Sequence, residues 1–273
     1  MNIRYVNSRG IEVNLNKEPY KLLVSDLLNH DWGIVEKSQR IVGFRKATTK
    51  RSVSIDIIKS SGKSSRRLMN DLTDVFEYDV INATPGRLYI DDNYLKCFLC
   101  SGEKENWETD VIISCEYGLV TDMPFWIQDR HFSFGISPGM MAAQNNLDYP
   151  HDYPYDYTAA GENSYIENDH YGACDFEMHI FGPVTNPSIL INNHLYEVTV
   201  RLEQGEYLQI RSREGTVYKV SESGEKTNLY NYRNKDSSVF EKIPPGSNPV
   251  SWDGNFGFDI TLYVERSEPQ WIL

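Results

Sequence analysis

Two cysteines, Cys97 and Cys100, form a C-x-x-C motif, the spacing found in zinc half-sites and redox-active thiol pairs. They lie in YLKCFLC (94–100), whose aromatic and aliphatic residues are typical of a β-strand. Residues three apart on a strand point to opposite faces, so the two thiols would not meet. No second C-x-x-C or H-x-x-x-H follows at zinc-finger spacing. We interpret Cys97, Cys100, Cys115 and Cys174 as reduced, partly buried thiols, in keeping with a reducing compartment.

Other reactive residue types also lack the spacing that chemistry requires. The segment DHYGACDFEMH carries His170, Cys174, Asp175 and His179. Their spacing matches no familiar metal site, and on a strand Cys174 and His179 would face opposite ways. KSSGKSS (59–65) lacks the first glycine of a P-loop, and no G-x-S-x-G elbow occurs. We therefore predict no catalytic, cofactor-binding or metal-binding residue, although a glycosidase carboxylate pair from distant strands would leave no short motif.

The segment DYPHDYPYDY (148–157) repeats Asp-Tyr-Pro at a four-residue interval, and its prolines favour an extended chain. Carboxylates four residues apart would then lie roughly 13 Å apart, whereas calcium ligands lie about 2.3–2.6 Å from the ion. Unless the chain turns sharply, the segment cannot surround one metal ion. Its aromatic side suits either carbohydrate stacking or a subunit interface, and we favour packing or an interface. The candidate residues are Tyr149, Tyr153, Tyr155 and Tyr157.

Charge and hydropathy restrict the partners of this 273-residue chain. Its formal charge is -12 and its basic residues form no long run, which argues against binding to nucleic acid or anionic membranes. No apolar stretch approaches the roughly 20 residues that a membrane-spanning helix needs. The start, MNIRYVNSRGIEVNLN, has no apolar centre like that of a signal peptide, so we expect synthesis in a cytoplasm.

The residue pattern predicts that most of the chain forms short strands separated by turn residues, which is typical of β-sandwiches and β-barrels. The helical exception is 64–78, which places Leu68, Leu72, Val75 and Phe76 on one face after a capping serine. Residues 19–30 suit either a helix or a strand. The predicted strands are 53–58, 87–90, 94–100, 110–117, 188–191, 195–202, 207–212, 216–220 and 256–265.

We predict a mainly β fold that divides near residue 130, because the helix lies in the first half and none follows Trp126. The N-terminal domain (1–130) is α+β, with one helix packed on a sheet. The C-terminal domain (131–273) is an all-β sandwich. Between the two lies a polar, Tyr-rich loop or arm at about 137–170, and loops of such length commonly have a function or contact another subunit.

In order along the chain, these motifs resemble the distal tail proteins (Dit) of long, flexible-tailed bacteriophages. The first half contributes RSVSIDII, the helix SRRLMNDLTDVF, PGRLYIDDNYLKCFLC and MPFWI, which contains Phe125 and Trp126. The second half contributes YPHDYPYDY, FGPVTNPSILINNHLYEVTVRLEQGEYLQI, VFEKIPPG and the terminal RSEPQWIL. Each motif alone is weak evidence, and the resemblance rests on the order of the motifs along the chain.

The resemblance implies a structural protein of the virion without catalytic activity or cofactor. The N-terminal domain would form a ring, usually a hexamer, around a channel through which DNA passes without specific binding. The C-terminal domain would be a galectin-like β-sandwich that faces outward. The hub would join the tail tube to a tail-associated lysin or fibre protein, and in some phages to receptor-binding proteins. Phe125 and Trp126 are added to the tyrosines as candidate packing or interface residues.

Two other functions remain open. The sandwich could be a carbohydrate-binding module for host wall glycans, for which His179, Asn193, Arg201 and Arg211 are candidate residues. No interval in the sequence is long enough to contain an additional inserted carbohydrate-binding domain. A cell-wall hydrolase is the least favoured alternative.

Overall fold

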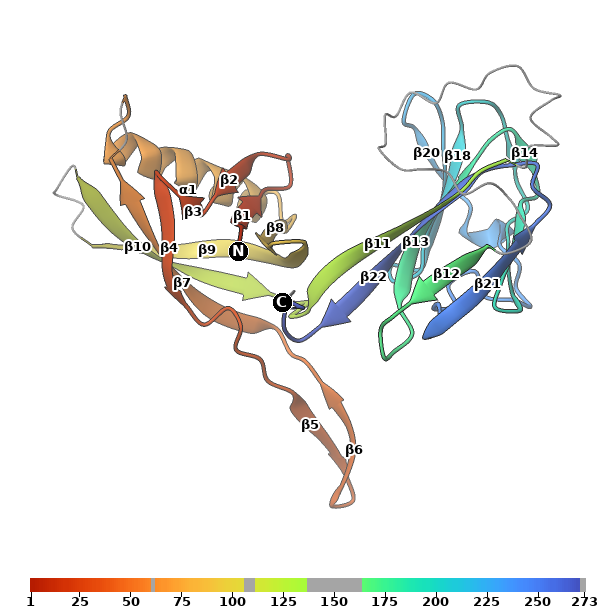
Figure 1. Cartoon of the computed structure of the whole chain (residues 1–273), viewed down its shortest axis with the longest axis horizontal. Coiled ribbons are helices and arrows are strands. Elements are labelled where there is room, and N and C mark those ends of the chain that lie inside the picture. Colours follow the sequence, from red (N-terminus) through yellow and green to blue (C-terminus); the bar gives the residue numbers. More distant parts are fainter. Residues whose placement is uncertain (60–61, 106–110, 137–163, 271–273) are drawn as a thin grey trace. The chain divides into compact units, whose positions relative to one another are not determined.

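A computed structural model describes residues 1–59, 62–105, 111–136 and 164–270 (Figure 1). The chain forms two compact units, one made of Met1–Gln128 with Glu265–Leu273 and the other of Asp129–Val264. Strands β11 (Trp126–Phe134) and β22 (Phe258–Arg266) contribute residues to both units. Strands dominate the described residues and α1 is the one α-helix among them, which confirms the prediction of a mainly β fold with a single helix.

The first unit is built around an antiparallel sheet with the strand order β11-β9-β10-β7-β4-β3. Strand β8 pairs with β9 and β1, and β1 also pairs with β2. Residues 19–30, which suit a helix or a strand by sequence, contain strand β4. The other elements of this unit are β1 (Ile3–Val6), β2 (Glu12–Asn14), β3 (Asn16–Lys17), β4 (Tyr20–Ser25), β5 (Gly33–Lys37), β6 (Arg40–Arg45), β7 (Thr49–Ile58), α1 (Ser65–Ile81), β8 (Gly86–Ile90), β9 (Asn93–Glu105) and β10 (Ile112–Thr121).

Helix α1 lies against this sheet and supplies one wall of the core (Figure 1). The Ser64 hydroxyl accepts a hydrogen bond from the Arg67 backbone at 3.3 Å, which caps the first turn as the sequence predicts. Phe76 packs edge-on between two rings, 5.0 Å from Tyr5 and 5.1 Å from Tyr117. The four apolar residues predicted to share one face are all buried.

The helix continues to Ile81, beyond the predicted end at residue 78, because its last turn is bonded to the start of the chain. Asp79 is fully buried, and its carboxylate accepts hydrogen bonds from the Tyr5 hydroxyl at 2.6 Å and the Ser8 backbone at 2.7 Å. Gly86 passes so close that a Cβ there would lie 2.2 Å from the Tyr5 hydroxyl oxygen. Tertiary contacts therefore set the end of the helix.

The second unit is a two-sheet β-sandwich. One sheet has the order β20-β19-β18-β13-β22-β11, the other has the order β12-β21-β15-β16, and β14 pairs with β17. Buried side chains from both sheets form one core, in which Phe176 meets Tyr196 edge-on at 5.6 Å. The elements are β12 (Tyr165–Asn168), β13 (Asp175–Phe181), β14 (Val184–Thr185), β15 (Ser188–Ile191), β16 (His194–Glu197), β17 (Arg201–Leu202), β18 (Tyr207–Arg211), β19 (Thr216–Val220), β20 (Lys226–Asn228), the 3-10 helix η1 (Tyr230–Tyr232) and β21 (Gly246–Trp252).

One predicted strand, 195–202, is wrong as a single element. The chain there forms β16, which pairs with β15, and then β17, which pairs with β14. Between them the Thr199 backbone donates a hydrogen bond to the Tyr232 carbonyl at 2.8 Å. The apolar alternation runs on through this segment, but its backbone changes pairing partner.

Candidate functional site

Strands β5 and β6 form a hairpin that, among the described strands, pairs only with itself (Figure 1). The register runs from Gly33 opposite Arg45 to Lys37 opposite Arg40. The two turn residues, Ser38 and Gln39, have φ values of 51° and 63°, which is the left-handed conformation that a two-residue type I′ turn requires. The hairpin is therefore a regular structure that extends from the first unit.

Apolar side chains cover this hairpin and are exposed. Ile34, Ile41, Val42 and Phe44 are 55–59% exposed. Because successive residues on a strand point to opposite faces, the adjacent pair Ile34-Val35 places apolar groups on both faces, and the register shift opposite Val42 leaves that apolar residue outside the regular pairing. An isolated two-stranded hairpin is marginally stable in water, and contiguous exposed apolar surface marks an interaction site. We therefore define residues 33–45 as the candidate assembly hairpin.

The base of the assembly hairpin is fixed to its own unit by an aromatic and cationic contact. Trp32 packs edge-on against Phe125 with ring centroids 5.8 Å apart. The Lys46 ammonium lies 4.7 Å from the Phe125 ring and donates a hydrogen bond to the Pro124 carbonyl at 3.0 Å. Burial and the nearby charge of Arg51 lower the pKa of Lys46. The contact joins both ends of the hairpin to the segment before β11.

Charge also distinguishes the assembly hairpin from the rest of the chain. It contains the cations Lys37, Arg40 and Arg45 and one carboxylate, Glu36, so its formal charge is +2. The whole chain has a formal charge of -12. A basic hairpin is electrostatically complementary to an acidic partner surface, including that of another copy of this chain.

Exposed apolar side chains also occur elsewhere on the first unit. At the end of α1, Ile81 is 79% exposed and Val80 is 40% exposed. On β4, Leu23 is 49% exposed. These residues supply exposed apolar surface separate from the hairpin.

The predicted site residues fall in three different environments. Phe125 is half-buried at the hairpin base, and Trp126 is 1% exposed within the core of the first unit. Tyr149, Tyr153, Tyr155 and Tyr157 lie outside the described residues. Sequence reasoning missed the assembly hairpin, although IVEKSQRIVGF has β-branched residues on both sides of a polar pentapeptide. Ser-Gln is not one of the usual type I′ turn sequences, and this weakened the signal.

The thiols are arranged as the strand prediction requires. Cys97 is buried and Cys100 is exposed, so the two point away from each other on β9, and all four cysteines are free. Burial raises the pKa of Cys97 to about 12. Within the described ranges, no group of three or more His, Cys, Asp and Glu side chains is placed to hold a metal ion. The helix in the same ranges is too short and too polar to cross a membrane.

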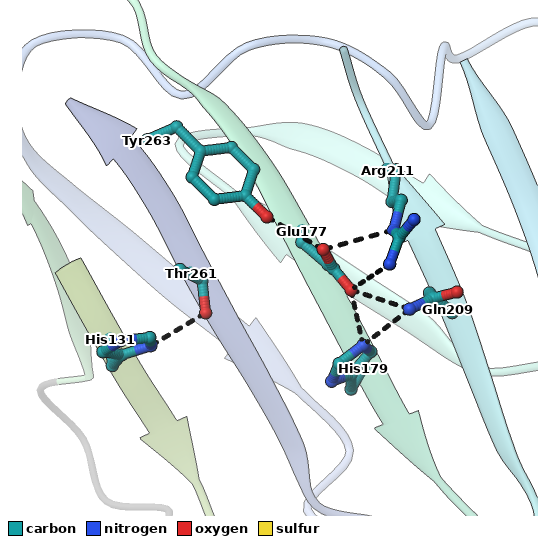
Figure 2. A network of polar contacts seen from close by, with 7 residues as sticks. All are labelled: His131, Glu177, His179, Gln209, Arg211, Thr261 and Tyr263. Carbon is teal, nitrogen blue, oxygen red and sulfur yellow. Dashed lines mark hydrogen bonds and ion pairs between the residues drawn. The ribbon is translucent and has the colours of Figure 1, made fainter. Parts of the chain in front are cut away.

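Two of the four candidate glycan residues come together on the second unit, and two do not. His179 on β13 and Arg211 on β18 both contact Glu177 (Figure 2). Asn193 lies in the turn between β15 and β16, where its φ is 64°. Arg201 forms an ion pair with Glu203 at 2.8 Å. Sequence reasoning missed Glu177 as the centre of the cluster because strand phase alone does not show which carboxylate meets which donor.

The fold matches three solved phage structures along nearly its whole length, whereas no protein-family model and no curated protein matches the sequence. One is the crystal structure of the Dit protein of phage SPP1, described as a paradigm of the hub adsorption apparatus in phages that infect Gram-positive bacteria. It shares 8% identity with a TM-score of 0.56, covering 97% of this chain and 98% of that one.

The other two are chains in the activated phage P2 baseplate, solved with calcium and with strontium. The calcium form has 11% identity and a TM-score of 0.59. The strontium form has 12% identity and a TM-score of 0.61. Both matches cover 98% of this chain and 99% of the other. At these identities the likeness shows a common fold.

Proposed function

We propose that this protein is a structural hub of a phage tail tip, a distal tail protein that acts by assembly and not by catalysis. The observation that carries the proposal is the match over both units to the SPP1 Dit protein, which is described as a paradigm of a hub adsorption apparatus, with 97% of this chain covered. The two baseplate chains, which match just as completely, support a place at the end of a tail. The protein would act in the virion, after synthesis in the cytoplasm of the bacterial host.

The assembly hairpin is the proposed contact between subunits of a hexameric ring. Its exposed apolar faces need a partner, and its base is held at a defined angle by Trp32 and Phe125. In a ring each hairpin meets a different surface of the next copy, and the exposed apolar end of α1 is a candidate receptor. Its positive charge on an acidic chain favours a copy of the same protein as the partner.

The ring would connect the tail tube on one side to a tail-associated lysin or fibre protein on the other, with receptor-binding proteins as further partners. DNA would pass through the channel without specific binding, since the acidic chain repels phosphate. Co-expression with tail tube and lysin proteins of the same phage tests the role directly. We expect the protein in purified tail tips at six copies per ring; its absence from them would reject the proposal.

A wall glycan-binding function of the second unit is the second candidate. The observation that favours it is the cluster around Glu177, where His179 and Arg211 meet on one face of the sandwich (Figure 2). It is compatible with a structural hub, because it concerns a different unit of the chain.

A further inference from the structure

The outer face of one sandwich sheet carries polar and aromatic side chains in register. On β13, the alternate residues Phe176, Met178 and Ile180 are buried in the core, so Glu177 and His179 lie on the opposite face. Glu177 is opposite Thr261 of β22 on one side and Arg211 of β18 on the other. His179 is opposite Asp259 and Gln209 in the same two strands. Three adjacent strands thus present one continuous polar patch.

Glu177 is the centre of this patch and is held from several sides (Figure 2). Its Oε1 accepts hydrogen bonds from Gln209 at 2.7 Å and contacts the His179 Nε2 at 2.9 Å. Its Oε2 accepts a hydrogen bond from the Tyr263 hydroxyl at 2.8 Å and lies 3.2 Å from the Arg211 Nε. Burial alone would raise the pKa of Glu177, but these hydrogen bonds and the Arg211 charge lower it to about 2. The carboxylate is ionised and fixes the direction of its neighbours.

The neighbours of Glu177 keep further hydrogen-bonding capacity. Arg211 uses Nε and Nη2 toward the carboxylate, and its side chain is 38% exposed. His179 uses Nε2, and its side chain is 35% exposed. Gln209 is 5% exposed, and its Oε1 has no hydrogen-bond partner in the described chain. A buried acceptor without a donor costs about 1–3 kcal/mol, and this oxygen keeps acceptor capacity that the described chain does not use.

Aromatic rings border the same patch. The Tyr207 ring lies edge-on to His179 at 5.3 Å, and Phe181 lies 6.5 Å from Tyr207. Both rings are half-buried, so each still offers part of its surface to solvent. A half-exposed ring next to fixed polar groups suits a ligand that has both C–H surface and hydroxyl groups.

We propose that this patch is a binding site for a neutral saccharide, centred on His179, Gln209 and Arg211. A sugar hydroxyl both donates and accepts, so it can accept from the guanidinium while donating to the unpartnered Gln209 oxygen. The C–H face of the sugar ring packs against Tyr207. Because the Gln209 oxygen is covered in the free protein, binding requires neighbouring side chains to change rotamer, as commonly happens at binding sites.

The charge of the patch favours a neutral ligand over an ionic one. The Arg211 cation is paired with the Glu177 carboxylate, so the pair offers no net charge to an anion. Asp259 lies on the same face, where burial raises the pKa of its carboxyl group. A divalent cation would need Glu177 oxygens that already accept several hydrogen bonds. This inference rests on the glycan-binding function proposed above for the second unit. The site does not depend on ring assembly, so its test can succeed or fail independently of the hub proposal.

The test is an NMR titration of the full chain, observing the imidazole groups of its six histidines. The probes are glucose, galactose, N-acetylglucosamine and lactose, each added to millimolar concentration, with inorganic phosphate as the ionic comparison. We expect saturable shifts at His179 with at least one sugar, no matching shift with phosphate, and no change at His194, which lies on the other sheet.

Three variants locate the site. Arg211→Ala and Tyr207→Ala each weaken sugar binding about tenfold or more, because each removes one side chain that contacts the sugar. Arg201→Ala is the matched control, since Arg201 is an exposed arginine of the same unit whose side chain forms an ion pair with Glu203. Its backbone carbonyl, which accepts a hydrogen bond from the Lys219 side chain, is kept in the variant. An unchanged His194 signal shows that each variant is folded.

Three results would overturn the proposal. The first is a folded protein in which no sugar produces a saturable shift. The second is sugar binding that Arg211→Ala leaves unchanged. The third is a His179 shift produced only by phosphate or only by another protein of the same virion, which would assign the patch to an ion or to a protein interface.

Discussion

Replacing Glu177 by glutamine removes the charge at the centre of the sandwich cluster while keeping the size of the side chain. The glutamine amide group would face Arg211, His179 or Tyr263, all of which donate to or contact the carboxylate. Glutamine keeps one acceptor oxygen but places an NH2 group where the other carboxylate oxygen was. The donors that face this NH2 group lose their acceptor, so Glu177→Gln destabilises the second unit. The size of the effect follows from the shifted pKa of this group.

The pKa of Glu177 falls from its ordinary value of 4.5 to about 2, and its side chain is 16% exposed, so solvent screening is limited. A shift of this size corresponds to about 3 kcal/mol of stability at pH 7. Because the folded pKa is the lower one, this stabilisation is present above about pH 4.5 and is lost as the pH falls toward 2. About half remains at pH 3.

Hydrogen exchange of the β13, β18 and β22 amides, followed by mass spectrometry, measures this stability in the second unit alone. We expect a difference between wild type and Glu177→Gln of about 3 kcal/mol at pH 7 that shrinks to nearly zero by pH 2. Subtracting the stability of the variant from that of wild type at each pH cancels the contribution of the other carboxylates. A difference independent of pH, or no difference at pH 7, would refute the reasoning.

Three further predictions concern the first unit. Ile41→Ser with Phe44→Ser removes two apolar side chains that are 57% and 59% exposed, so the stability of the monomer stays nearly unchanged. Each contact between subunits loses ~2 kcal/mol, and sedimentation measures an affinity that is about 30-fold weaker. Unchanged assembly would show that the hairpin is not the contact. Asp79→Asn lowers the melting temperature by several degrees, because the buried Asp79 carboxylate accepts a hydrogen bond from the Tyr5 hydroxyl at 2.6 Å. An unaltered melting curve would be inconsistent with that hydrogen bond. Iodoacetamide alkylates Cys100 first in the native protein because it alone of the four thiols is exposed, and equal labelling of all four would contradict the packing of β9.

The sequence predicts well what depends on neighbouring residues. The buried stripe of α1 and the capping Ser64 are local patterns, and both occur as predicted. The strands with apolar alternation, such as β7 and β10, likewise form, although β7 begins at Thr49, before the predicted residue 53, and β10 ends at Thr121, beyond the predicted residue 117. Local periodicity is sufficient for these elements because each one buries a single face.

The features that escaped prediction depend on distant residues or on surfaces without a partner. Asp79 stabilises the last turn of α1 through contacts with residues more than 70 positions away in sequence. The Glu177 cluster joins three strands whose mutual register no local pattern reveals. The assembly hairpin is apolar on both faces, so it lacks the alternation by which a half-buried strand is recognised. Its exposure becomes visible only in the folded unit.

The mass of the native assembly tests the central claim most directly. Native mass spectrometry of the wild-type chain, alone and co-expressed with tube and lysin proteins of the same phage, would measure the number of copies of this 31.5 kDa subunit. We predict a closed ring of six copies, which Ile41→Ser with Phe44→Ser reduces to smaller species. A protein that remains strictly monomeric in both samples, and never enters tails, would contradict the account.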